Sequence, residues 1–366
     1  MIRIYGVTVG NGSYARVVRG VARALGELGL CDGVVPLDLL DDWDTDYGGQ
    51  FAKVAVVIAP QTARAAVSAA TMGMHEQRLM LLPMNSSYCP ESMLKLSQPM
   101  PEQGRTVPLV TGWLTPSRWS AEQLLHLTPS PVTVWRHGVG AEFVPDDALL
   151  SLLRESRAQG EFRVLHLTST PRQRKGTALL IEAWSKLLRS GALPKQSRLT
   201  LVLSSEGSGG AIDAKLALMP SDVAASVHVI RTPLDLSEQD ASSMYQGFHA
   251  IAQPSRGEGF GMVPLEALCC GVPVVATACS GHSEFLADST PGLSVVRHGP
   301  VAKMDDGPGA LAPSVTADAV ADALVRAHDG WDALADAARA SAAELGKTWS
   351  WTSVMRQWAA KEGWLA

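Results

Sequence analysis

Short apolar runs rich in valine, isoleucine and leucine recur along the chain and alternate with segments of helical periodicity. Runs of this length and composition are typical of strands buried in a parallel sheet. The alternation predicts doubly wound α/β layers. The predicted strands are "IRIYGVTV", "KVAVVIAP", "RLMLLPMN", "PVTVW", "FRVLHLTS", "RLTLVLSS", "SVHVIR", "HAIAQPS" and "VPVVATAC".

Helical spacing is clearest in two segments that follow predicted strands. Apolar residues repeat at this spacing from Tyr14 to Leu28, and the run stops at Gly29. The same spacing runs from Ala178 to Trp184, directly after the tripeptide "RKG". Both segments are therefore predicted to be helices that cover a sheet.

The strand pattern breaks between Pro145 and Gly160, where "PDDALLSLLRESRAQG" predicts a connecting helix. A chain of 366 residues also exceeds the roughly 250 to 300 residues that one hydrophobic core usually serves. We therefore expect two domains, residues 1–145 and 146–345, followed by a tail, 346–366. The tail holds four of the ten tryptophans, and we expect a helix that packs on a large surface through Trp351, Val354, Met355 and Trp358.

Composition excludes several classes of protein. With 46% hydrophobic and 18% charged residues, each domain can bury a core. The net charge of −5 differs from the basic surplus usual for nucleic-acid binders. Five cysteines without a C-x-x-C fit neither a disulfide framework nor a zinc cluster, and no run reaches a membrane span. We expect a folded, cytoplasmic protein without an integral membrane segment.

Ligands of open α/β sheets collect at the carboxyl ends of strands, and the loop "RGEGFG" follows one predicted strand. Its glycines let backbone N–H groups approach a ligand, and a helix that should begin near Met262 or Val263 attracts anions. Glu258 on the loop and Glu266 in the helix bracket this anion site. Such a pair suits a nucleotide sugar, which has a sugar at each end and phosphates between them, because a carboxylate accepts two hydrogen bonds from neighbouring hydroxyls. A structural role for Glu266 at the helix start is the alternative.

Two further turns carry candidate residues. Arg172, Arg174 and Lys175 precede a predicted helix start, where each positive charge is unfavourable by roughly 0.3–1 kcal/mol unless an anion is bound. An exposed basic loop would look the same. Gly10 and Gly12, between the first strand and the first helix, could close over phosphates, although such glycine pairs also occur in simple tight connections.

Taken together, "RKG" after one strand and "E-G-F-G-x4-E-A" after a later one resemble the second domain of retaining glycosyltransferases of family 4. The segments "CCGVPVVATACSGHSEFL" and "VWRHGVGAEFVP" are similar to further motifs of that family, as is the tryptophan-bearing tail. The resemblance is good over about residues 130–290. It implies the GT-B fold: two Rossmann-like domains facing across a cleft, acceptor on 1–145 and donor on 146–345, with the C-terminal helix 346–366 crossing back to the first domain.

The resemblance also implies roles for individual residues. Glu258 would contact hydroxyls of the transferred sugar and Glu266 the ribose, while Arg174 and Lys175 would hold the diphosphate. The reaction would need no metal and no cofactor beyond the co-substrate, a UDP- or GDP-linked nucleotide diphosphate sugar. The expected catalytic residues are Glu258, Arg174 and Lys175; the donor-binding set is Gly10, Gly12, Arg172, Gly259, Phe260, Gly261, Leu265, Glu266 and Thr232; and His137, Asn85 and Ser86 are possible acceptor or cleft residues.

The chain departs from the family pattern in three places. Thr170 stands where the family often has an arginine, so either Arg172 or Arg174 must replace it. "SGHSE" replaces the usual paired glycines and leaves the role of Glu284 open. Asn85 and the two serines after it occupy the place where many relatives have a catalytic histidine.

Some interpretations stay open at this stage. His137 fits a structural position at least as well as a ligand contact, and "DDWDTD" at residues 41–46 is interpreted as a solvated loop rather than a metal site. A nucleotide-sugar epimerase and a non-catalytic sugar-nucleotide binding subunit are the alternative functions. The acceptor, whether a small molecule, a glycan, a protein or modified nucleic acid, is not determined.

Overall fold

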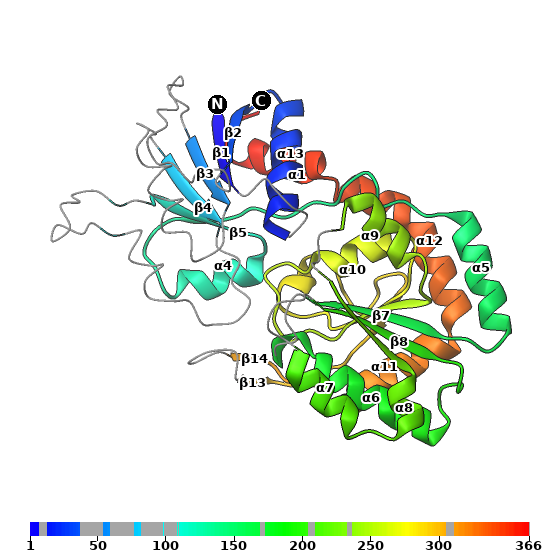
Figure 1. Ribbon diagram of the computed structural model, residues 1–366. Helices are drawn as coiled ribbons and strands as arrows, with labels where there is room; N and C mark the ends of the chain where they lie inside the picture. Colours follow the sequence, from blue (N-terminus) through cyan, green and yellow to red (C-terminus); the bar gives the residue numbers. More distant parts are fainter. Residues whose placement is uncertain are drawn as a thin grey trace. The chain divides into compact units, whose positions relative to one another are not determined.

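The computed structural model describes residues 1–6, 13–36, 54–58, 77–81, 98, 108, 110–168, 173–203, 209–232, 236–304 and 311–365. Their contacts separate two compact units. The first unit comprises Met1–Gly140 together with Thr348–Ala366, and the second comprises Ala141–Lys347. Each unit is built around a sheet with helices packed on it (Figure 1).

The sheet of the first unit has the strand order β2-β1-β3-β4-β5-β6 within the described residues, and all of its pairs are parallel. Helix α1 (Ser13–Glu27) buries Val17, Val21 and Leu25, which are spaced so that they share one face. Helix α4 (Arg118–Leu125) follows β5. The strands are β1 (Ile2–Gly6), β2 (Cys31–Pro36), β3 (Val54–Ile58), β4 (Gln77–Leu81), β5 (Gly112–Thr115) and β6 (Val132–Val134).

The sheet of the second unit has the order β12-β11-β10-β7-β8-β9 within the described residues, again with parallel pairs only. Its first strand, β7, therefore lies beside its fourth, β10, and the chain order reverses between them. Open α/β sheets bind ligands at the carboxyl ends of the strands at such a reversal. The strands are β7 (Arg163–Thr168), β8 (Arg198–Leu203), β9 (Val227–Arg231), β10 (Ala250–Gln253), β11 (Val274–Ala276) and β12 (Leu293–Val295).

Helices of the second unit cover its sheet, and a small antiparallel hairpin, β13 (Val301–Lys303) with β14 (Leu311–Pro313), lies apart from that sheet. Two short 3-10 turns, η3 (Gln173–Lys175) and η4 (Ser280–Glu284), follow β7 and β11. The helices are α5 (Asp147–Ala158), α6 (Thr177–Ser190), α7 (Gly209–Ala217), α8 (Ser221–Ala225), α9 (Glu238–Tyr245), α10 (Met262–Cys269), α11 (Ala317–Asp329) and α12 (Trp331–Thr348).

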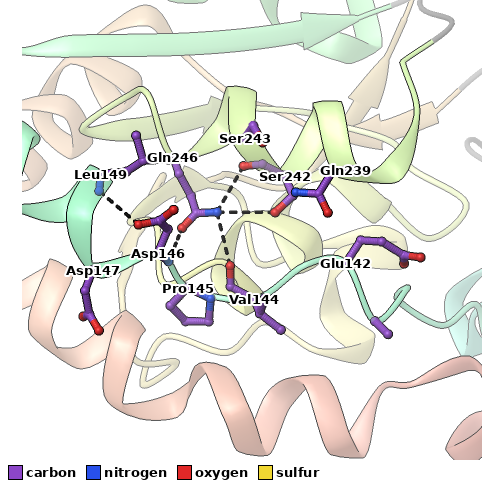
Figure 2. A pocket seen from close by; sticks show the side chains of 11 residues that line it. Glu142, Val144, Pro145, Asp146, Asp147, Leu149, Gln239, Ser242, Ser243 and Gln246 are labelled. Atoms are coloured by element: carbon purple, nitrogen blue, oxygen red, sulfur yellow. Dashed lines mark hydrogen bonds between the residues drawn. The ribbon is translucent and has the colours of Figure 1, made fainter.

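The segment that leads into α5 is fastened to the end of α9 by one side chain (Figure 2). Gln246 accepts a hydrogen bond from the N–H of Asp146 at 2.5 Å and donates to the carbonyl of Val144 at 3.2 Å. Asp146 in turn caps α5, because its carboxylate accepts the N–H groups of Ala148 and Leu149. The start of the second unit is thus held by polar contacts rather than by a buried strand.

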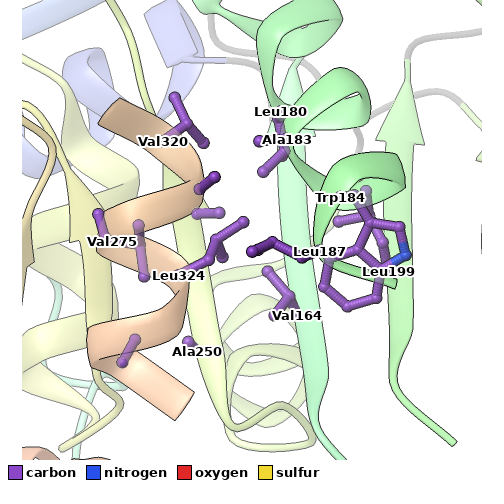
Figure 3. Packing of buried hydrophobic residues seen from close by; sticks show 14 of the residues in the cluster. Val164, Leu180, Ala183, Trp184, Leu187, Leu199, Ala250, Val275, Val320 and Leu324 are labelled. Atoms are coloured by element: carbon purple, nitrogen blue, oxygen red, sulfur yellow. The ribbon is translucent and has the colours of Figure 1, made fainter. Parts of the chain in front are cut away.

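The core of the second unit lies where α6 and α11 pack beside each other on the sheet (Figure 3). Leu180 and Leu187 of α6 belong to the same buried cluster as Leu324 of α11 and Val164 of β7. Each fully buried leucine or valine stabilises the fold by about 1.5–3 kcal/mol relative to exposure. This packing fixes the positions of the strands and of the loops that follow them.

The predicted parallel α/β architecture is confirmed. Each of the nine predicted segments contains a strand, and α10 begins at Met262 as expected. The sequence pattern missed β2, β5 and β12 because these strands are short or carry polar residues and glycine, as in "CDGVVP" of β2. It also missed the hairpin of β13 and β14, whose strands have three residues each.

The C-terminal helix α13 (Trp351–Lys361) packs against α1 in the first unit, as predicted (Figure 1). Trp351 and Trp358 are buried on its inner face, and the ring of Trp358 lies edge-on to Trp135 at 5.8 Å. The hydroxyl of Ser350 caps the helix by accepting the N–H of Ser353. The tail therefore completes the first unit.

The contact between α1 and α13 predicts opposite effects of alanine at two glycines of α1. A Cβ atom at Gly20 would lie 2.3 Å from the ring of Trp351, whereas one at Gly26 would meet nothing within 4 Å. Overpacking should make Gly20→Ala destabilising by about 1–3 kcal/mol, while Gly26→Ala should gain up to about 1 kcal/mol of helix propensity. Urea unfolding followed by tryptophan fluorescence measures both. Equal midpoints for the two variants would contradict the packing.

Candidate active site

The loops that follow β7 and β10 meet through a cluster of charged side chains. The Lys175 Nζ atom donates to Oε1 of Glu258 at 2.6 Å, and Nη1 of Arg174 donates to Oε2 of the same carboxylate at 3.3 Å. Lys175 and Arg174 lie in η3, and Glu258 lies between β10 and α10. The structure thus brings together the three residues predicted to be catalytic, at the strand ends where the chain order reverses.

Main-chain contacts tie the same two loops together. The N–H of Arg256 donates to the carbonyl of Arg174 at 2.7 Å, and Nη1 of Arg174 donates to the carbonyl of Gly257 at 3.1 Å. Arg256 also reaches away from the cluster, because its Nε donates to the carbonyl of Pro313 in β14 at 3.0 Å. Hydrogen bonds therefore fix the backbone of both loops that carry the charged side chains.

Burial and charge act in opposite directions on Glu258, which is 8% exposed. Burial raises the pKa of its carboxyl, but Lys175 and Arg174 together outweigh this effect and lower the pKa to about 2. Burial lowers the pKa of Lys175, and the negative charge of Glu258 only partly offsets that change. A ligand that brings its own negative charge, such as a diphosphate, would supply these cations with a second anionic partner.

Two buried histidines stand close to the charged cluster in a neutral form. Nδ1 of His166 lies 2.8 Å from the carbonyl of Ala252 and therefore carries the proton, which leaves Nε2 to accept from the Thr177 hydroxyl at 2.9 Å. Nδ1 of His282 donates to the carbonyl of Thr277 in the same way. Burial lowers the pKa of both rings, to about 4 for His166. His166 is thus a satisfied core residue.

Glu266 lies in α10 and is 1% exposed. Its carboxylate accepts a hydrogen bond from the Tyr245 hydroxyl at 2.8 Å, and the Tyr245 ring stacks on Phe143. The predicted contact with a ribose stays a prediction. The structure shows that Glu266 is also held from α9, a partner that the sequence analysis did not identify.

The other predicted donor-binding residues of the second unit are distributed around the loop and the strands. The Phe260 side chain is buried against Phe285, with ring centres 5.3 Å apart, and Leu265 is 1% exposed. Both side chains therefore serve the packing of the loop and of α10. Thr232 follows β9 and donates its N–H to Leu203. Gly259 and Gly261 flank Phe260 within the loop.

His137 lies in the first unit, in the segment after β6. It is 7% exposed, its ring centre lies 5.9 Å from that of Trp351, and burial lowers its pKa to about 3. This packing supports the structural role, and a donor or acceptor contact stays a prediction. Gly10, Gly12, Asn85, Ser86, Arg172 and the segment "DDWDTD" lie outside the described residues.

The sequence analysis missed a side chain that contacts the backbone of Glu258. The Ser280 hydroxyl accepts the N–H of Glu258 at 3.1 Å. The only signal in the sequence was the departure from paired glycines at "SGHSE", which marked the position but not the contact. In the part of the chain that the structure describes, no group of His, Cys, Asp and Glu residues has an arrangement suited to a metal ion. No described helix could cross a membrane.

A sequence model of "Family 4 Glycosyltransferase in conflict systems" matches residues 118–358. The chain belongs to this family. The match covers the whole second unit and most of α13, so it contains every charged residue of the cluster described above.

Curated relatives of this family 4 chain match parts of it. A D-inositol 3-phosphate glycosyltransferase of Frankia alni is 33% identical over 133 residues, which is 36% of this chain and 32% of the relative. A protein of the same name from Mycobacterium avium is 32% identical over 158 residues, which is 42% of this chain and 37% of the relative. The matches therefore span about a third of the length of these relatives.

Solved structures share the fold over the whole chain. Alr3699/HepE of Anabaena in complex with UDP-glucose has a TM-score of 0.66 at 14% identity, covering 100% of this chain and 99% of that one. The sucrose-phosphate synthase of Thermosynechococcus elongatus also has a TM-score of 0.66, at 16% identity, covering 99% and 98%. At such identities the likeness shows the fold, which is GT-B as predicted.

The second unit also contains a cavity of about 590 Å³ beside Gln246, at the ends of α5 and α9 (Figure 2). Glu142, Asp146 and Asp147 give its wall an acidic character. None of the residues predicted to bind the donor lines it. An acidic wall is unfavourable for a diphosphate, so the charged cluster between β7 and β10 is the better candidate for an anionic ligand.

The lowered pKa of Glu258 predicts how acid affects stability. The Glu258 carboxyl has a pKa of about 2 in the folded chain and an ordinary pKa of 4.5 in the unfolded chain. The charged carboxylate therefore stabilises the fold fully above about pH 4.5. This contribution is lost as the pH falls from 4.5 towards 2. The stability difference between the wild type and Glu258→Gln should therefore shrink between about pH 6 and about pH 3.5, as measured by urea unfolding. Glu182→Gln, at an exposed position of α6, is the control, and a pH-independent difference for Glu258→Gln would contradict the ion pair.

Proposed function

We propose that the chain is a retaining glycosyltransferase that transfers a hexose from a nucleotide diphosphate sugar to an acceptor. The observation that carries this proposal is the convergence of Glu258, Lys175 and Arg174 at the carboxyl ends of β7 and β10. Membership of family 4 supports it, as does the shared fold with a protein solved with UDP-glucose.

The cluster provides two kinds of contact that such a donor needs. Lys175 and Arg174, together with the start of α6 just behind them, supply positive charge for a diphosphate. The Glu258 carboxylate can accept hydrogen bonds from sugar hydroxyls once the cations have a diphosphate as an additional partner. Glu266, one turn into α10, is the proposed partner of the ribose.

The proposed reaction breaks the bond between the anomeric carbon and the diphosphate oxygen. The electron pair leaves with the diphosphate, and Lys175 and Arg174 stabilise the charge that develops on it. The acceptor oxygen attacks the oxocarbenium-like carbon from the face that the diphosphate leaves, so the configuration is retained. The acceptor proton passes to a leaving phosphate oxygen, which balances the step.

The two predicted domains would divide the substrates between them. We propose that residues 146–345 bind the donor and residues 1–145 bind the acceptor, with the helix in 346–366 completing the acceptor domain. The class of acceptor is left open among small molecules, glycans, proteins and modified nucleic acid. A cytoplasmic location is part of this proposal, and it is supported by four free thiols among the described residues, Cys31, Cys269, Cys270 and Cys279.

A donor screen followed by two substitutions tests the function. UDP-glucose or GDP-mannose should raise the melting temperature of the wild type, because a ligand that binds only the folded chain stabilises it. Lys175→Ala and Glu258→Ala should each lower release of nucleotide diphosphate by about tenfold or more, since a truncated buried polar contact costs about 1–3 kcal/mol. Release is measured by coupled assay and the fold by circular dichroism.

Lys186→Ala is the matched control, because Lys186 lies on α6 close to the site in sequence but is exposed and paired with Asp318. Its turnover should equal that of the wild type. Wild-type turnover in Lys175→Ala or Glu258→Ala would contradict the assignment. A changed sugar without an acceptor would identify an epimerase, and stabilisation without turnover would identify a binding subunit.

A further inference from the structure

Ser280 adopts an unusual backbone conformation beside the charged cluster. Among the described residues other than glycine, it alone has a positive φ angle, +50°. Glycine adopts this left-handed conformation without strain, whereas a side chain with a Cβ atom does not. A serine in this strained conformation suggests that its hydroxyl group makes a contact that glycine could not make.

The hydroxyl of Ser280 holds one side of the Glu258 main chain, and its neighbour holds the other. Oγ of Ser280 accepts the N–H of Glu258 at 3.1 Å, and the N–H of Gly281 donates to the carbonyl of Glu258 at 2.9 Å. The two segments touch so closely that a Cβ atom at Gly281 would lie 2.4 Å from the carbonyl carbon of Gly259. Glu258 is thus fixed on both sides of its Cα atom.

This contact continues the sheet beyond the ends of its strands. β10 and β11 are paired in regular parallel register up to Gln253 and Ala276. Past the strand ends, the Thr277 hydroxyl donates to the carbonyl of Ser255, and then Ser280 meets Glu258. Two side-chain hydroxyls and the main-chain bond from Gly281 to Glu258 therefore carry the alignment of the sheet into the loop.

We infer that Ser280 is a positioning residue, which sets the place of the Glu258 carboxylate through the main-chain N–H of Glu258. The inference rests on the proposed function, because it takes the ligand of Glu258 to be the sugar of the donor. Ser280 and Glu258 are 4% and 8% exposed, so loss of the hydroxyl leaves a shielded N–H without its acceptor. The loop then moves to find another partner, and the carboxylate moves with it.

Ser280→Gly and Ser280→Ala test the inference together. Both lack the hydroxyl, but only glycine relieves the backbone strain, so Ser280→Gly should melt higher than Ser280→Ala. In both variants the Glu258 amide, identified in 15N-glutamate spectra by its absence in Glu258→Gln, should exchange with solvent about tenfold faster or more. The Glu266 amide inside α10 should keep its rate.

The ligand readout separates positioning from stability. The KM for UDP-glucose should rise about threefold or more in both variants, and the Kd for UDP should rise by a smaller factor, because Glu258 is assigned to the sugar directly and to the nucleotide only through Lys175 and Arg174. An unchanged exchange rate would overturn the inference. So would faster exchange with an unchanged KM, which would leave Ser280 a structural role only.

Failure of the proposed function gives a different pattern. If the wild type binds neither UDP-glucose nor GDP-mannose, the proposed function is contradicted. The exchange rate of the Glu258 amide still tests whether the Ser280 hydroxyl binds the N–H of Glu258. Faster exchange in both variants supports the contact, and wild-type rates overturn it.

Discussion

One carboxylate shared by two cations is the interaction on which the candidate site depends. Glu258 receives Lys175 on one oxygen and Arg174 on the other, and all three side chains are largely removed from water. Breaking a buried pair by removing one partner is costly because it leaves an uncompensated charge. The pair therefore holds the loops after β7 and β10 in a single arrangement and keeps two cations ready for an anionic ligand.

The sheet determines where this pair can form. β7 and β10 are the first and fourth strands of their unit and lie side by side, so their following loops start as neighbours although some 80 residues separate them in sequence. The hydrophobic core between α6 and α11 packs against the sheet and fixes these strands. The hydroxyls of Thr277 and Ser280, in the segment after β11, form hydrogen bonds with the loop that follows β10. Core packing, strand register and the ion pairs thus all contribute to the positions of Glu258, Lys175 and Arg174.

The strands with long apolar runs could be predicted from the sequence, because valine and isoleucine in a fully buried sheet leave a continuous signal. β2 and β12 could not, since "CDGVVP" contains glycine and an acid, and a serine interrupts the apolar residues of "LSV". Glu258 and Lys175 could be located because each follows a strand and lies close to a helix start. Their direct ion pair could not be predicted, as it depends on which strands are neighbours in the sheet.

The contacts of Ser280 and His137 depend on tertiary structure alone. Ser280 reaches Glu258 only because its backbone turns into the left-handed region, and no local pattern for serine predicts that. His137 is covered by Trp351, which arrives from the far end of the chain with α13. Propensity and spacing describe neighbours in sequence, so such partners become visible only in the folded chain.

The most direct measurement of the central claim is a crystal structure of the protein with UDP-glucose bound. The account predicts diphosphate oxygens within hydrogen-bonding distance of Lys175 and Arg174 and a glucose hydroxyl on the Glu258 carboxylate. A nucleotide sugar bound elsewhere, with the glucose away from residues 254–261 and no phosphate contact to either cation, would contradict it.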